Sequence, residues 1–472
     1  MSQHSGTPAP QPAAAPSTGA DASKSTAAAD PPSLVQILTS RGYHVLLLAS
    51  ALIGFPIAAI AYGFVVAVNE LSDLVWHTAP QNFGWSQPTA WYAIVILTIA
   101  GLITGLTIRF LPGTAGHLPV FGFAAGGSPT GKMLPGVVIA ATATLVLGVV
   151  LGPEAPLVAI GGGLVMLVTA RGKLSGNMQA RTLLATAGSA AAISAIFGNP
   201  LVAVVLMLEI VGLAGSQVML VLLPCMLSAG VGAIIFTGLN SWTGLNAPTL
   251  GIPGLAEAPL DGADLVWCIP IAIVAAVIAQ LTRRIGLRVA GFAAKRTVLT
   301  PVVAGALVGL CAAAYTLLTD RSVLDVLQSG EVALPKLVSN PQAWPIAALI
   351  GVLLFKSIAY GISLGSFRGG PTFPAIFLGA VLGVLVAPLP GLGATAGLAI
   401  GMASATTAVL RLPVTSVVLV VLMLGSSGME QIPVIMVGAT IALITAVAMD
   451  GRKTVGGADP STLTEKARPA TA

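Results

Sequence analysis

The sequence predicts an all-α polytopic membrane protein in which two inverted-topology repeats bring broken helices together at the midplane of the bilayer. Composition is the first reason, because 56% of the 472 residues are hydrophobic and 8% are charged, whereas soluble domains carry about 25% charged residues. The second reason is a glycine-proline motif that occurs once in each half of the chain. The third is that equivalent segments of the two halves differ in their content of Lys and Arg.

Apolar segments of roughly 17 to 25 residues, each long enough to cross a bilayer, recur along most of the chain. In the first half such segments, together with shorter apolar runs, are expected at 44–68, 91–110, 136–151, 154–169, 182–197, 201–213 and 217–238. A turn-rich stretch at 111–135 and a loop at 239–264 separate some of them. Around a membrane domain at 34–451 we expect a disordered N-terminal tail at 1–33, rich in Ala, Pro, Ser and Thr, and a short polar C-terminal tail at 452–472.

The central motif is Gly152-Pro153-Glu154-Ala155-Pro156, which places one carboxylate between two prolines inside an apolar run. Proline suits the first turn of a helix, so the motif predicts a break in the backbone and a helix that begins near Glu154. A helix N-terminus attracts anions through its unpaired N–H groups and its dipole. Glu154 is itself an anion tethered at that place, and it would compete there with a free anion. We therefore interpret Glu154 as a gate.

The pattern returns in the second half as Gly370-Pro371-Thr372-Phe373-Pro374, at an offset of 218 residues (370 − 152 = 218). A second echo pairs the prolines at positions 200 and 413, at an offset of 213 (413 − 200 = 213). These offsets predict two repeats, at about 44–240 and 262–450.

The two repeats are predicted to have opposite orientations in the membrane. Residues 61–108 contain no Lys or Arg, whereas the matching segment after 265–281 carries Arg283, Arg284, Arg288, Lys295 and Arg296. Basic residues favour the cytoplasmic side, so equivalent loops lie on opposite faces. In such inverted repeats two broken helices point their N-termini at one substrate site near the midplane.

The sequence lacks the residue patterns that are typical of an enzyme active site or of a metal-binding site. The cysteines at 225, 268 and 311 lie singly in apolar segments, and the four histidines are dispersed. No catalytic residues, no metal site and no cofactor are therefore expected. The basic residues are scattered between apolar runs, which predicts a role in membrane topology and no binding of nucleic acid.

With these motifs the chain resembles the CLC family of chloride channels and proton/chloride exchangers over about residues 44–450. The segment around Glu154 is similar to that family's GxEGP motif, residues 370–374 are similar to its GxFxP motif, and residues 113–119 loosely match its GSGIP motif. The resemblance implies an all-helical homodimer in the cell membrane, with its own anion pathway in each subunit. It also implies that Glu154 occupies the anion site when it is deprotonated and leaves the site when it takes up a proton.

The resemblance further implies which residues line the pathway. Backbone groups of the matched motifs are expected to bind the anion, at Gly152, Pro153, Ala155, Gly116, His117, Thr372, Phe373, Pro374 and Ala375. Lys356 and Arg368 flank the second broken helix, where they would either raise the anion concentration in a vestibule or extend to the lipid interface.

Several positions depart from the family's pattern. The internal glutamate that relays protons in the family's exchangers falls on Ile210, with Glu209 one residue earlier, which is about 100° around a helix. Glu209 is therefore either part of a proton path or a partner in an interhelical hydrogen bond. Gly116 replaces the serine of GSGIP, and residues 450–453 offer no equivalent of the family's pore tyrosine.

We expect a CLC-type channel that carries chloride or a similar small monovalent anion through the lipid bilayer. A proton-coupled chloride or fluoride antiporter remains an alternative, because the gating glutamate is retained. A transporter of a larger organic solute on the same scaffold is a third reading, since loss of the serine and tyrosine would widen the pathway.

Overall fold

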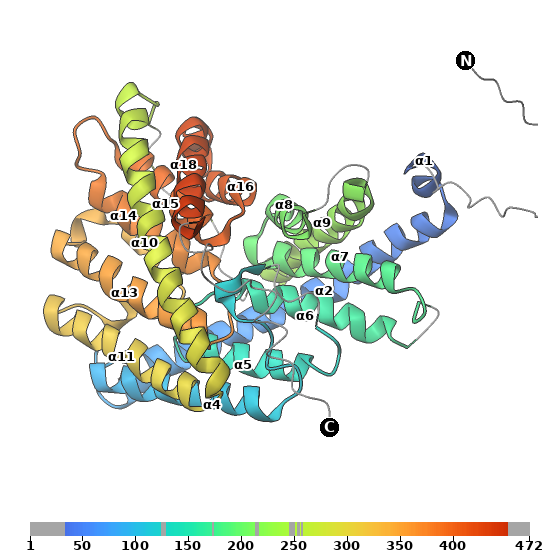
Figure 1. Cartoon of the computed structure of the whole chain (residues 1–472), viewed down its shortest axis with the longest axis horizontal. Helices are drawn as coiled ribbons and strands as arrows, with labels where there is room; N and C mark the ends of the chain where they lie inside the picture. The colour runs from blue at the N-terminus through green and yellow to red at the C-terminus, as the bar shows by residue number, and fades with distance from the viewer. Residues whose placement is uncertain are drawn as a thin grey trace, which may run out of the picture.

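The computed structural model describes residues 34–123, 129–171, 174–212, 217–244, 251–252, 255 and 258–451. Helices make up most of this part of the chain, and no strand occurs within it (Figure 1). The predicted all-α class is confirmed. The tails expected at 1–33 and 452–472 lie outside the described residues.

The first half of the chain contains the helices α1 (Leu34–Leu38), α2 (Arg41–Asp73), η1 (Leu74–Thr78), α3 (Ala79–Asn82), α4 (Ala90–Phe110), η2 (Pro119–Phe121), α5 (Leu134–Val146), α6 (Glu154–Thr169), α7 (Met178–Phe197), α8 (Pro200–Val211) and α9 (Gln217–Thr243). The second half contains α10 (Gly262–Lys295), α11 (Leu299–Thr319), η4 (Val323–Asp325), α12 (Ala333–Ser339), η5 (Pro341–Ala343), α13 (Ile346–Ser366), α14 (Thr372–Val386), α15 (Ala394–Leu410), α16 (Pro413–Leu424), α17 (Ser426–Glu430) and α18 (Ile432–Gly451).

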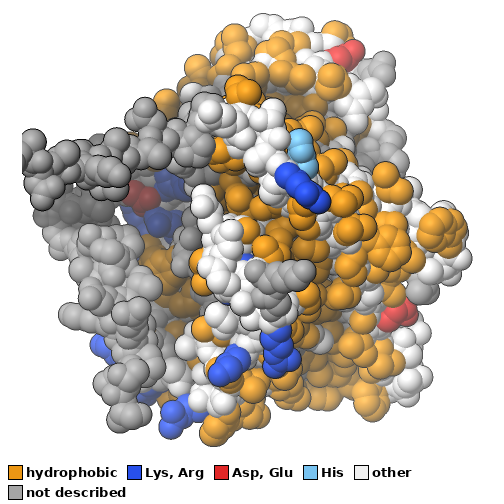
Figure 2. All heavy atoms as spheres, turned by 90° about the vertical axis from the view of Figure 1, so that its right-hand side faces the viewer, with side chains coloured by type: hydrophobic (Ala, Val, Ile, Leu, Met, Phe, Trp, Pro, Cys, Tyr) orange, Lys and Arg blue, Asp and Glu red, His pale blue; other side chains and the backbone are white. Residues whose placement is uncertain are grey.

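Eight helices of the described residues are long and apolar enough to cross a membrane. The shorter apolar helices α5, α6, α8, α14, α15 and α16 have between 10 and 17 residues. At about 1.5 Å per residue these helices are shorter than the roughly 30 Å hydrocarbon core, so they end within it. Figure 2 shows apolar side chains over much of the visible face, with few charged side chains among them. The protein is a multi-pass membrane protein.

The two halves repeat the same helix packing. In Figure 1 helices α6 to α9 lie on the right, and α10, α13, α14 and α15 lie on the left. Gly161 of α6 meets the backbone of Gly188 on α7 so closely that a Cβ has no room, and Gly379 of α14 meets Gly401 of α15 in the same way. The offsets of these pairs are again 218 (379 − 161) and 213 (401 − 188). The predicted fold of two inverted repeats is confirmed.

Helices α4 and α11 join the two halves. They lie side by side at the bottom of Figure 1 and cross at glycines. Gly101 of α4 lies against the carbonyl of Pro301, and Gly305 of α11 lies against the carbonyl of Leu97. Small residues of this kind allow close backbone contact between membrane helices, where dispersion forces hold the pair together.

The distribution of basic residues assigns an inner and an outer face. The basic second half of α10 lies beside η2, since Gly286 contacts Val120. At the opposite face the acidic end of α2 approaches η4, where the side-chain amide of Gln328 donates to Ser72 Oγ at 3.3 Å. Because Lys and Arg favour the cytoplasmic side, η2 marks the inner face and η4 the outer face.

Several expected boundaries differ from the structure. The first span is longer than 44–68, since α2 covers Arg41–Asp73, and both ends of the loop expected at 239–264 are helical, since α9 ends at Thr243 and α10 begins at Gly262. The apolar run at 136–151 was expected as one segment, but α5 ends at Val146. Gly148 has a positive φ of 81°, which ends the helical path. The indole of Trp76 fills the space beside Gly148 and donates to Val146 O at 3.1 Å. The extended segment that leads to Glu154 is therefore set by a contact between distant residues.

Candidate functional site

Glu154 is the first residue of α6, and its side chain is fully buried. Its carboxylate oxygen Oε1 accepts a hydrogen bond from the backbone N–H of Phe373 at 2.9 Å. The other oxygen, Oε2, lies against the Cα of Gly370 and has no hydrogen-bond partner within the described residues. The carboxylate of the first broken helix thus reaches the N-terminus of the second.

A pair of glycines holds the two helix starts together. The N–H of Gly152 donates to Gly370 O at 2.7 Å, and the N–H of Gly370 donates to Gly152 O. A Cβ at either position would overlap the carboxylate of Glu154, so this close approach requires glycine. The carboxylate therefore sits in a pocket walled by glycine where α6 and α14 meet.

The geometry limits which backbone N–H groups can serve an anion here. Pro153 and Pro374 have no N–H, and the N–H of Gly152 is already bonded to Gly370. The N–H groups of a first helical turn have no partner within their own helix. Those that remain for an anion are the groups of Glu154, Ala155, Thr372, Phe373 and Ala375.

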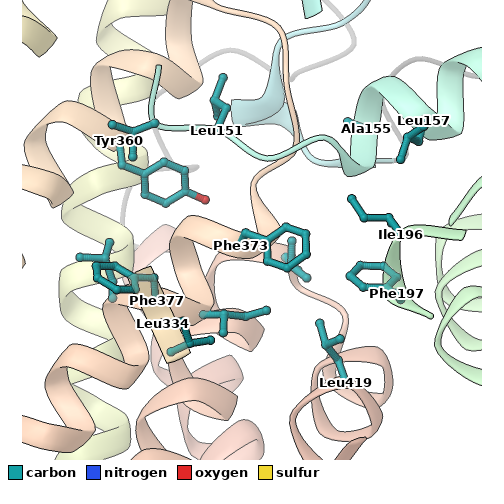
Figure 3. Close-up of a cluster of buried hydrophobic side chains, with 14 of the residues drawn as sticks. Leu151, Ala155, Leu157, Ile196, Phe197, Leu334, Tyr360, Phe373, Phe377 and Leu419 are labelled. Carbon is teal, nitrogen blue, oxygen red and sulfur yellow. The ribbon is translucent and has the colours of Figure 1, made fainter. Parts of the chain in front are cut away.

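Apolar side chains enclose the start of α14. Phe373 is 2% exposed and faces Phe197 at the end of α7, with ring centroids 5.9 Å apart (Figure 3). Ala375 is equally buried. The hydroxyl of Tyr360 on α13 points toward the start of α14 and donates to Pro371 O at 2.5 Å. Few water molecules can screen charges in such surroundings, so electrostatic interactions at Glu154 are strong.

The loop before η2, residues 111–118, is attached through Arg368 to the segment that leads into the second broken helix, α14. The guanidinium of Arg368 is 7% exposed and donates from Nε and Nη2 to Thr114 O, at 3.2 and 2.9 Å. Its Nη1 donates to Phe367 O at 3.2 Å. Arg368, which lies two residues before Gly370, therefore fixes the position of this loop relative to the site.

Within that loop the backbone turns sharply at four successive residues with positive φ, Gly113 (85°), Thr114 (51°), Ala115 (58°) and Gly116 (93°). The N–H of Gly116 donates to Gly113 O at 3.0 Å, so it is used inside the loop. His117 follows, half-buried, on the inner side of the structure.

Lys356 on α13 is fully buried and faces the protein backbone. Its ammonium donates to four successive carbonyls, those of Asp325 (3.5 Å), Val326 (2.9 Å), Leu327 (2.9 Å) and Gln328 (3.2 Å). It also lies 4.8 Å from the ring centroid of Phe377 on α14. The side chain thus shapes the outer segment 325–328 and does not extend to the lipid interface.

Glu209 near the end of α8 bonds the start of α16. Its two carboxylate oxygens accept the N–H groups of Val414 at 3.0 Å and Thr415 at 2.7 Å. A carboxylate at this place accepts hydrogen bonds from two N–H groups that have no partner within α16, and it interacts favourably with the positive end of the helix dipole. Ile210, where the resemblance places a proton-relaying glutamate, packs against the main hydrophobic core.

Sequence reasoning missed Tyr360, which bonds the start of α14, and Glu331, which lies in the segment that Gln328 joins to Gly148. A signal for Glu331 was present, because Gly330-Glu331 echoes Gly116-His117 at an offset of 214 (330 − 116 = 214). Both glycines have the same backbone conformation, with φ of 93° at Gly116 and 90° at Gly330. Glu331 is thus the outer counterpart of His117. No group of three metal-binding side chains occurs in the part of the chain that the structure describes.

A family model described as "Voltage gated chloride channel" matches residues 100–447. Two relatives named "Putative ion-transport protein YfeO", from Escherichia fergusonii and Escherichia coli, are each 29% identical over 367 residues, covering 74% of this chain and 81% of the relative.

Two solved structures have a similar fold. A slow cyanobacterial Cl−/H+ antiporter has a TM-score of 0.70 and 18% identity, covering 89% of this chain and 97% of its own. A CLC-type fluoride/proton antiporter has a TM-score of 0.64 and 18% identity, covering 85% and 95%. At this identity the likeness concerns the fold alone.

Proposed function

Because the chain belongs to the voltage gated chloride channel family, CLC, we propose that it moves chloride or a similar small monovalent anion across the membrane through a pathway gated by Glu154. The observation that carries this proposal is the hydrogen bond from the N–H of Phe373 to the Glu154 carboxylate. A carboxylate bound by the N-terminus of another helix occupies a place that is suited to a free anion.

The gate works by competition between the tethered anion and the free one. Deprotonated Glu154 fills the pocket between Gly152 and Gly370. When Glu154 takes up a proton, it loses the charge that holds it at the N-termini of α6 and α14, and the side chain can leave. The N–H groups of Phe373, Thr372 and Ala155 then become ligands of the anion.

Uncoupled conduction, as in a channel, is the form of transport we favour. Ile210 has no titratable group at the position where the family's exchangers carry a proton relay, and Glu209 is engaged by two backbone N–H groups of α16. A proton-coupled antiporter is the second candidate. It is favoured by the retained carboxylate of Glu154 and by the two structural neighbours, which are named as antiporters.

We also propose that the protein acts as a homodimer in the cell membrane, with one pathway in each subunit. Arg368 and Lys356 contribute positive charge near the site, which raises the local concentration of anions. Their contacts with backbone carbonyls give both residues a second role in holding the segments beside the site.

The substitution Glu154→Gln tests the gate. Purified protein is reconstituted into liposomes, and chloride efflux is recorded at a series of pH values. The amide mimics a protonated side chain, so efflux should become independent of pH. Above the midpoint of the unmodified protein, flux through the variant should exceed the wild-type flux by about tenfold for each pH unit.

Glu430→Gln is the matched control, since this exposed acid at the end of α17 lies outside the site, and its efflux should keep the wild-type pH dependence. The gate assignment is wrong if the Glu154→Gln variant, correctly folded by gel filtration, retains both the flux and the pH dependence of the wild type.

A further inference from the structure

A cavity of about 310 Å³ lies on the outer face, beside the segment that leads to Glu154. Its lining comes from residues within 76–88 and 322–344. Gly152 and Gly370, which wall the pocket of the carboxylate, are not part of this lining. Pockets that hold small molecules have volumes of about 300 Å³ or more. The cavity is therefore large enough for a small organic molecule, at a place separate from the gate.

The charge that the cavity offers to a ligand is positive. Lys336 on α12 lines it, is exposed, and makes no ion pair within the described residues. His77 lines it as well, and a histidine ring can donate a hydrogen bond. The carboxylate of Asp325 in the lining is already bound by Arg321 at 2.9 Å and by the hydroxyl of Tyr315 at 3.0 Å. The group best suited to Lys336 and His77 is therefore an anion.

The rest of the lining suits the uncharged part of an organic molecule. Leu324, Val332 and Trp344 contribute apolar side chains, and Gln81 contributes an amide. The guanidinium of Arg321 lies over the indole of Trp344, 4.0 Å from the ring centroid, and holds the ring in place. A chloride ion would leave most of the cavity unfilled. The ligand that fits is therefore a small organic anion with an apolar or aromatic body.

Two residues of the lining hold the segment that leads to the gate. The indole of Trp76 packs against Gly148, where a Cβ would have no room. The backbone N–H of Gln328 donates to Gly148 O at 2.9 Å. Gly152, which walls the pocket of the Glu154 carboxylate, follows four residues later. A displacement of either lining residue would therefore displace the segment in front of Glu154.

Trp76 is fixed between the cavity and Gly148. It lies in η1, a π-helical turn at the end of α2, and such turns are frequent at functional sites. The residue belongs to the lining yet is fully buried, so it lies directly beneath the surface of the cavity. Its indole meets the ring of Tyr92 edge to face, with centroids 5.9 Å apart, and the hydroxyl of Tyr92 donates to Val75 O at 2.7 Å. A side chain packed in this way transmits a change at the cavity to Gly148.

We propose that the outer cavity is an inhibitory site for a small organic anion, whose charged group binds Lys336 and His77. The bound anion holds η1 and Gln328 in the positions in which they support Gly148. These contacts exist in the structure that has Glu154 in its pocket, so the ligand stabilises this closed form and lowers the flux. The inference rests on the proposed function of Glu154 as the gate, and it adds a place where a molecule in the outer solution acts on that gate.

The test uses benzenesulfonate, whose permanent negative charge prevents it from carrying protons across the liposome membrane. Its binding to the purified full-length protein in detergent is measured by calorimetry. Chloride efflux is measured at one pH with the compound in the outer solution. We expect saturable binding and a fall in efflux over the same range of concentration. The uncharged benzenesulfonamide should bind about tenfold more weakly, because it lacks the charge that Lys336 and His77 recognise.

The substitution Lys336→Gln should raise the dissociation constant of benzenesulfonate by about tenfold, since it removes a charged hydrogen-bond donor. The concentration that halves the efflux of this variant should rise by the same factor. Lys295→Gln is the matched control, because this exposed lysine lies at the inner end of α10. Its binding of benzenesulfonate should equal that of the wild type.

A covalent label in the cavity provides a second test. Gln81→Cys is treated from outside with sulfonatoethyl methanethiosulfonate, which leaves an organic anion attached within the lining. Efflux should fall, and it should recover when a reducing agent removes the label. Asn82→Cys is the matched control, since this neighbouring exposed residue is not part of the lining. The unmodified protein, treated in the same way, controls for its own three cysteines.

Absence of saturable binding overturns the inference, and so does binding that leaves the efflux unchanged. Equal inhibition of the wild type and of Lys336→Gln would mean that the compound blocks the anion pathway itself, which also overturns it. An equal effect of the label on Gln81→Cys and Asn82→Cys has the same consequence. The gate is judged separately: if Glu154→Gln keeps the wild-type pH dependence, the proposed function fails, whatever the calorimetry shows.

Discussion

At the scale of single residues, the site depends on buried charges that bind the backbone. Lys356 and Arg368 both lie inside the protein, and both donate to carbonyl oxygens of segments beside Glu154. A buried cation with several carbonyl partners avoids the cost of an unpaired charge and orders the segment that supplies the carbonyls. These two side chains therefore determine where the loop before η2 and the segment 325–328 lie.

Replacing Lys356 with Met should destabilise the outer segment. The change leaves up to four carbonyls without their shared donor, which costs about 3 kcal/mol. The thermal unfolding midpoint in detergent should fall by about 3 °C or more. Lys336→Met is the matched control, because this lysine on α12 is exposed, and its unfolding midpoint should stay unchanged. Equal midpoints for the two variants would contradict the role of Lys356.

At the scale of helices, close contacts between glycines define each repeat. The contact of Gly379 with Gly401 joins α14 to α15, and the contact of Gly161 with Gly188 joins α6 to α7. In each pair one helix begins at the site, so the glycine contact fixes the direction of its N-terminus. The orientation of both anion-attracting helix ends therefore depends on small residues located well away from Glu154.

Gly379→Ala should weaken the packing of α14 on α15. The added Cβ would lie 2.4 Å from the carbonyl oxygen of Gly401, so the helices must separate. Overpacking of this kind costs about 1 to 3 kcal/mol. The control is Gly230→Ala on α9, where an added Cβ meets nothing within 4 Å. In a thermal unfolding assay the first variant should lose stability, while the second should hold or gain it because Ala favours the helix.

At the scale of the whole molecule, the question is whether the movement of anions across the membrane is coupled to the movement of protons. If transport is uncoupled, a chloride gradient across the liposome membrane should drive no proton flux in fixed proportion to the chloride flux. A pH electrode and a chloride electrode in the same sample measure the two fluxes. Glu209→Gln should keep the anion flux within about twofold, because the amide oxygen can still accept an N–H group of α16. Proton uptake in fixed proportion to chloride efflux would support the antiporter, and its loss in Glu209→Gln would place that residue on the proton path.

Much of the fold could be predicted because it follows from local patterns. The starts of α6 at Glu154 and of α14 at Thr372 follow from glycine-proline breaks in apolar runs. The helix α8 begins at Pro200, within one residue of the expected segment. The end of α5 could not be predicted, because it depends on Trp76, which lies 70 residues from Val146 along the chain.

The same distinction applies to the candidate site. By itself the sequence determined the membrane class, the two repeats and the placement of one acid at the start of a broken helix, since composition, offset and proline position are local properties. Only the tertiary structure decided that Phe373 donates to Glu154, that Glu209 caps α16, that Lys356 binds carbonyls and that Gln328 donates to Gly148 O. Each of these contacts joins different helices or loops, and three of the four join the two halves of the chain. Their geometry is therefore set by helix packing and cannot be read from either segment alone.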